Sequence, residues 1–119
     1  MSIPVELHAL ERAIGGLGPE ALLVTVTENS TPHVVSVIVT YVDGTLVMGG
    51  GRRTRANVEV HPRVTLLWPL LHDDAYRLIV DGDATTTPDE QVEVVPTDAV
   101  FHRVADASGD GPNCLALDG

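Results

Sequence analysis

Hydrophobic and polar residues alternate over much of this chain with the two-residue period of β-strands. Short valine-rich runs are separated by turn sequences, among them Asp43-Gly44, a pair typical of tight hairpins. The pattern predicts strands at 21–28, 33–42, 45–48, 63–70 and 75–84, with 91–95 and 99–104 completing the sheet. It indicates a mostly β fold, a barrel of six or so antiparallel strands with short helices.

Two segments have a helical pattern instead. Apolar positions in residues 3–17 recur at three- and four-residue spacings, between Pro4 and the pair Gly15-Gly16. Residues 52–61 follow three glycines and end before Pro62, which predicts one or two further helical turns. We expect a single domain over residues 1–104. The polar residues 105–119 are expected to form a loosely ordered tail.

The segment 33–42 is apolar on both faces. Val35 and Val37 lie on one face, and Val34 and Ile38 on the other. A strand buried on both sides needs cover outside the barrel, and a chain of 119 residues is too short to provide it. We therefore expect a homodimer.

Composition and charge narrow the range of partners. The chain is 44% hydrophobic but 3% aromatic, so its core is expected to be aliphatic, and stacking on single-stranded nucleic acid is disfavoured. A net charge of −10 argues against DNA and RNA, which bind mainly through cationic side chains. No apolar run approaches the roughly 20 residues of a membrane helix. We therefore expect a cytoplasmic protein with no membrane partner.

The positive charge is concentrated in one place. All seven basic residues are arginines, and four of them, Arg52, Arg53, Arg55 and Arg63, fall within twelve positions. The first three follow Gly49-Gly50-Gly51 at the start of a predicted helix, where backbone N–H groups and the helix dipole attract anions. Arginine adds bidentate donors suited to phosphate, and Thr54 adds a hydroxyl. The alternative is that the arginines merely solvate an exposed turn, but their concentration in an acidic chain favours phosphate binding.

Other chemistry is poorly supported. The histidines are scattered and lack metal-ligand spacing, so no metal site is predicted. Ser36 lies in a strand without the turn that activates a serine nucleophile. No residue is an evident general acid or base, which fits hydride transfer carried out by a cofactor.

Taken in order, these segments resemble a known family. The strand Pro32-His33-Val34-Val35-Ser36-Val37, the hairpin, the arginine cluster and the run from His61 to Trp68 are similar to the flavin-binding split barrels related to pyridoxamine 5′-phosphate oxidase. The resemblance covers residues 20–104. It implies an FMN-binding split barrel that is a homodimer and transfers a hydride to or from a small organic molecule.

The resemblance also implies which residues contact the cofactor. The phosphate would lie on the arginine cluster, formed by Arg52, Arg53, Thr54 and Arg55. The ring system would lie along two strands, on Val35, Ser36, Val37, Met48 and Gly49. Arg77 matches a polar position that faces the cofactor of the neighbouring subunit.

Alternatives remain within this family. Some members use the deazaflavin F420 in place of FMN, and others bind heme or carry no catalytic flavin. True pyridoxamine phosphate oxidases place basic residues in the strand matching residues 35–40, and this chain has none there. That difference argues against pyridoxamine phosphate itself as the substrate. An FMN- or F420-dependent oxidoreductase and a flavin or heme carrier or sensor both stay open.

Overall fold

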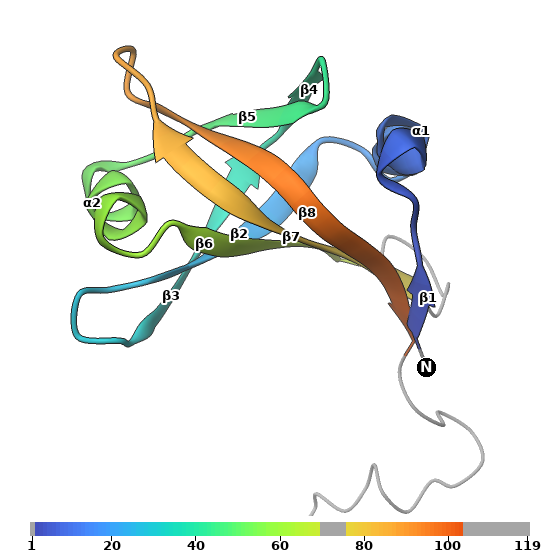
Figure 1. Ribbon diagram of the computed structural model, residues 1–119, viewed down its shortest axis with the longest axis horizontal. Helices are drawn as coiled ribbons and strands as arrows, with labels where there is room; N and C mark the ends of the chain where they lie inside the picture. Colours follow the sequence, from blue (N-terminus) through green and yellow to red (C-terminus); the bar gives the residue numbers. More distant parts are fainter. Residues whose placement is uncertain (1, 70–75, 104–119) are drawn as a thin grey trace, which may run out of the picture.

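The structure is a computed structural model that describes residues 2–69 and 76–103. These ranges contain the strands and helices drawn in Figure 1. The strands are β1 (Ser2–Pro4), β2 (Glu20–Val26), β3 (Pro32–Ile38), β4 (Thr40–Val42), β5 (Thr45–Gly49), β6 (Arg63–Trp68), β7 (Tyr76–Thr86) and β8 (Gln91–Arg103). The helices are a 3-10 turn (Leu7–Ala9), α1 (Leu10–Leu17) and α2 (Arg52–Val60).

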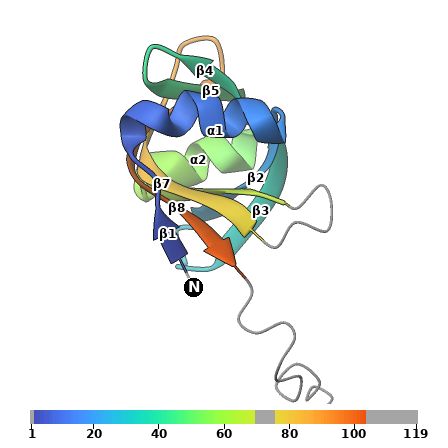
Figure 2. The same cartoon turned by 90° about the vertical axis from the view of Figure 1, so that its right-hand side faces the viewer.

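The strands form one curled antiparallel sheet. Its order is β3-β2-β6-β7-β8-β5-β4, and β1 pairs with β8. The two strands at the ends of this order, β3 and β4, are neighbours in sequence, and β3 also contacts β5. The sheet therefore curls back toward itself as a half-barrel, with α1 and α2 at opposite ends in Figure 1 and one in front of the other in Figure 2. The predicted mostly β fold is confirmed.

The predicted single strand at 33–42 is wrong in one respect, because it is interrupted at Val39. Before this break, β3 pairs with β2, and after it β4 pairs with β5. The N–H of Val39 donates to the carbonyl of Pro19 at 2.8 Å, which extends the β2–β3 register by one residue. The break lets one segment serve both ends of the curled sheet.

The two faces of this segment differ in exposure. Val37 on the inner face is buried, whereas Val34 and Ile38 on the outer face are 55% and 61% exposed. Val42 continues the outer face and is 47% exposed. We call Val34, Ile38 and Val42 the outer apolar row. Nothing in the described part of the chain buries it, so cover by a second copy stays a prediction.

The predicted helix at 3–17 begins later than expected. Residues 2–4 form β1, in which Ser2 pairs with His102 and Pro4 with Val100. The α-helix starts only at Leu10, after the 3-10 turn. Pairing with a distant strand overrides the local periodicity here.

The two strands predicted at 91–95 and 99–104 are one strand, β8, which runs through Pro96. A β-bulge absorbs the irregularity: Asp81 and Gly82 of β7 lie opposite Asp98 and Pro96, so Thr97 is the extra residue on β8. A Cβ at Gly82 would come within 2.5 Å of the carbonyl oxygen of Val95. Glycine is therefore required where the two strands cross this closely.

The core is aliphatic, as predicted, apart from Trp68. The indole of Trp68 is buried, and its Nε1–H donates to the carbonyl of Gly18 at 3.0 Å. Among the described residues, no helix is long and apolar enough to cross a membrane. The predicted tail at 105–119 and the strand ends predicted at Leu70, Ala75 and Val104 lie outside the described residues.

Candidate functional site

Helix α2 presents its first turn to solvent. Gly51 is its N-cap with extended backbone angles, and the N–H of Arg55 donates to the Gly51 carbonyl at 3.0 Å. Arg52 and Arg53 are exposed, whereas Thr54 is buried. Since the N–H groups of a first turn have no partner inside the helix, the two guanidinium groups and the helix start can act on the same anion.

A buried hydrogen bond fixes α2 to the sheet. The amide Nδ2 of Asn57 donates to Oγ1 of Thr25 in β2 at 3.0 Å, and both residues are at most 5% exposed. A buried polar pair of this kind has a defined geometry and is costly to break. It holds the arginine-bearing turn at a set position relative to β2 and its neighbour β3.

The three glycines before α2 have different surroundings. A Cβ on Gly50 would lie 2.7 Å from Cγ2 of Val92, so this residue must be small where the loop passes β8. A Cβ on Gly49 or Gly51 would meet nothing within 4 Å. These two residues border open space.

That space is a pocket of about 360 Å³ between β3 and the start of α2. Its lining residues are His33, Val35, Ser36, Val37, Gly49, Gly51, Arg52, Arg53 and Thr54. One wall is therefore largely apolar strand, and the other is a cationic helix start. Such a pocket suits a ligand with an apolar body and an anionic end.

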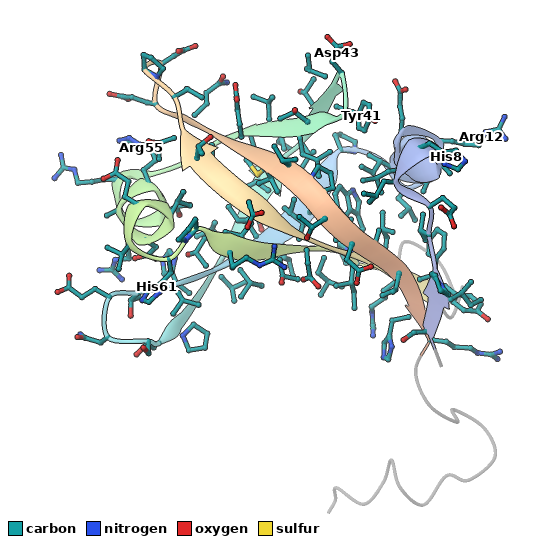
Figure 3. All side chains as sticks on the ribbon, in the orientation of Figure 1. His8, Arg12, Tyr41, Asp43, Arg55 and His61 are labelled. Carbon is teal, nitrogen blue, oxygen red and sulfur yellow. The ribbon has the colours of Figure 1, made fainter. Side chains whose placement is uncertain are left out.

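The pocket brings together most of the residues singled out in the sequence. Seven of the ten line it: Val35, Ser36, Val37, Gly49, Arg52, Arg53 and Thr54. Met48 does not, because its side chain is 1% exposed and belongs to the core. Arg55 also lies outside the lining. Its Cγ packs 3.3 Å from the position of a Cβ on Gly50, and Figure 3 shows it on α2, far from Arg12 on α1.

Arg77 and Arg63 lie elsewhere in the fold. Arg77 pairs with His102 near the start of β7, whereas Thr86 at the other end of β7 contacts Glu59 of α2. Nine residues of extended strand span about 30 Å, so one copy does not bring Arg77 to the pocket. The Nη1 of Arg63 donates to Oδ1 of Asp83 and Oγ1 of Thr97, each at 3.1 Å. Its charge is directed at β7 and β8.

Two lining residues, His33 and Gly51, were not identified as site residues from the sequence. His33 is half-buried, and its Nδ1 is buried with no hydrogen-bond partner among the described residues. The sequence pattern could have identified His33, because it shares the inner face of its strand with Val35 and Val37. His33 therefore places an unsatisfied polar atom beside the pocket.

Comparison with known proteins identifies two relatives by sequence and several solved structures with the same fold. No family model matches the chain. The uncharacterized proteins Mb0449c of Mycobacterium bovis and MT0457 of Mycobacterium tuberculosis are each 38% identical to it over 124 residues, which covers 91% of this chain and 85% of theirs.

Solved structures with the same fold come from several bacteria. A candidate pyridoxamine 5′-phosphate oxidase from Listeria innocua has a TM-score of 0.67 at 18% identity, covering 81% of this chain and 98% of that one. An FAD-binding protein from Mycobacterium smegmatis has a TM-score of 0.63 at 17% identity, covering 87% and 100%. The heme storage protein HutZ from Vibrio cholerae has a TM-score of 0.62 at 14% identity, covering 83% and 96%.

The structural similarity confirms the predicted split-barrel fold, and the 38% sequence identity shows homology to the two mycobacterial proteins. The chain belongs to the family of the two mycobacterial proteins, and its fold is the split barrel of the pyridoxamine 5′-phosphate oxidase-like proteins.

Proposed function

We propose that this protein binds FMN or a related phosphate-bearing flavin between β3 and α2 and acts as a homodimeric oxidoreductase on a small organic molecule. The observation that carries the proposal is the pocket itself, with an apolar strand facing two exposed arginines at a helix start. Its volume of about 360 Å³ lies within the range of roughly 300–1,000 Å³ usual for small-molecule sites.

The phosphate end of such a ligand fits the helix start. Arg52 and Arg53 supply charged donors, and the backbone of the first turn supplies further N–H groups. Arg55 does not line the pocket, so in this proposal Arg52 and Arg53 hold the phosphate without it.

The ring end fits the strand wall. Val35 and Val37 offer apolar surface, and Gly49 leaves open space beside them. The unsatisfied Nδ1 of His33 supplies a polar atom that could meet a heteroatom of the ring. A bound flavin would supply the hydride chemistry, and the residues of this chain would bind it, orient it and exclude water.

Two alternatives rest on specific observations. The deazaflavin F420 shares a phosphate and a flat ring with FMN, and one protein of the same fold is an F420 reductase. A heme carrier is the second candidate, because an imidazole lines the pocket and histidine is a common heme ligand. The absorbance spectrum of the purified protein distinguishes the three cofactors.

The sharper test measures the contribution of the arginines to binding. FMN and riboflavin are titrated calorimetrically into the wild type, Arg53→Ala and the control Arg12→Ala, which removes an arginine from α1. Each lost charged hydrogen bond is worth about 1.5–3 kcal/mol, so Arg53→Ala should weaken FMN binding about tenfold to a hundredfold. Riboflavin, which has no phosphate, should bind both variants as it binds the wild type. Unchanged FMN affinity in Arg53→Ala would mean that the cluster is a solvated turn.

A further inference from the structure

A second, smaller hollow shares one lining residue, Arg53, with the first pocket. Its volume is about 210 Å³, and it lies between α2 and the turn that joins β2 to β3. It is lined by Thr27, Glu28, Asn29, Arg53, Ala56, Asn57 and Val60. Because Arg53 lines both spaces, its side chain is within reach of groups bound in either one.

The walls of the second hollow are already formed. Arg53, Ala56, Asn57 and Val60 follow one another at positions i, i+3, i+4 and i+7 and so form one face of α2. The opposite wall is a turn closed by two backbone hydrogen bonds, from Thr27 N to the Thr31 carbonyl at 2.9 Å and from Ser30 N to the Thr27 carbonyl at 2.8 Å. A preformed site loses little entropy when it binds its ligand.

The size of this hollow indicates an extension of the first site. At about 210 Å³ it is below the range usual for an independent small-molecule site. We propose that the ligand is a flavin dinucleotide of the FAD type. The flavin and its first phosphate lie in the first pocket, the pyrophosphate contacts Arg53, and the adenosine half occupies the second hollow. This inference rests on the proposed function.

The lining chemistry favours an uncharged nucleoside. Val60 is 53% exposed and Ala56 is exposed, so the helix face offers apolar surface to a flat base. The Glu28 carboxylate and the Asn29 amide oxygen can accept hydrogen bonds from ribose hydroxyls or an adenine amino group. The same carboxylate repels a second acidic group, which disfavours a tail that carries carboxylates.

The test compares FAD with FMN in two variants and a control. Ala56→Leu fills the hollow with a good helix former at an exposed position, and Ala56→Ser keeps the hollow open. The wild type and Ala56→Ser should bind FAD at least tenfold more tightly than FMN. Ala56→Leu should lose that advantage and keep its FMN affinity within about twofold. Val60→Ser, which leaves the hollow open but makes its wall polar, should reduce the FAD advantage severalfold.

Each outcome bears on one proposal or on both. Equal affinities of the wild type for FMN and FAD would overturn the dinucleotide inference and leave the proposed flavin site intact. An undiminished FAD advantage in both Ala56→Leu and Val60→Ser would also overturn it. Equal losses of FMN and FAD affinity in Val60→Ser would count against it as well, because the second hollow would not act on adenosine alone. Failure of the wild type to bind either flavin would overturn both proposals.

Discussion

At the scale of single residues, the arginine cluster shows what sequence can and cannot resolve. The concentration of arginines after three glycines predicted a cationic helix start, and α2 does begin at Arg52, beside an open pocket. It could not separate Arg53, which lines the pocket, from Arg55, which packs along the loop. Residues two apart on a helix point about 200° apart, and only the placement of the helix decides which one faces a ligand. Arg63 was grouped with them by proximity in the chain, yet it pairs with Asp83.

The buried pair of Thr25 and Asn57 was also invisible in the sequence, because 32 positions separate the two residues. Asn57→Leu leaves the Thr25 hydroxyl buried without its donor, so the free energy of unfolding should fall by about 1–3 kcal/mol. The double variant Thr25→Val/Asn57→Leu should lose less than the sum of the single variants, because no polar atom is left unpaired. Urea denaturation of the four proteins measures this coupling. Additive losses would mean that the hydrogen bond contributes no coupling energy.

At the scale of elements, local pattern found the strands but not their bends. Alternation predicted strands at 21–28 and 63–70, and the ends of β2 and β6 agree with those ranges to within two residues. It missed the break at Val39 and the continuity of β8 through Pro96, since both depend on pairing with distant strands. Proline usually ends a central strand, and here a bulge at the next residue, Thr97, opposite Asp81 and Gly82, accommodates it.

The bulge gives a prediction with an internal control. Gly82→Ala forces a Cβ to within 2.5 Å of the Val95 carbonyl oxygen. This oxygen belongs to the backbone of β8, which cannot easily move away. We expect the free energy of unfolding to fall by roughly 1–3 kcal/mol, as in other overpacked sites. Gly15→Ala in α1 meets nothing within 4 Å and should raise it by about 0.5–1 kcal/mol. Thermal unfolding compares the two variants. A Gly82→Ala protein as stable as the wild type would show that the strands separate at little cost.

At the scale of the whole molecule, the residues alone predicted a mostly β barrel, and the split barrel followed from the resemblance of its motifs, in their order along the chain, to those of a known family. The identity of the ligand was not predictable to the same degree. It depends on how two hollows meet at Arg53, and on residues such as Val60 that have no motif. The resemblance implied that Arg77 faces the cofactor of the neighbouring subunit, and within one copy it lies at the far end of β7 from α2. A second copy would be needed to bring this residue to the site.

The outer apolar row is where we expect that second copy to pack. Val34, Ile38 and Val42 are 55%, 61% and 47% exposed and lie on one face of β3 and β4. Ile38→Asp places a charge in the proposed interface and should convert a dimer into the 12.6 kDa monomer, as measured by sedimentation at micromolar concentration. Because Ile38 is exposed within one copy, the variant should still fold. Val95→Asp is the matched control, since Val95 is 56% exposed but lies on β8, and it should remain a dimer. A second measurement tests whether the dimer completes the site. If the partner subunit supplies Arg77 to the flavin, Ile38→Asp should also weaken FMN binding, whereas Val95→Asp should not.

A wild type that sediments as a monomer would remove the proposed interface, and a dimeric Ile38→Asp protein would place the interface on another face.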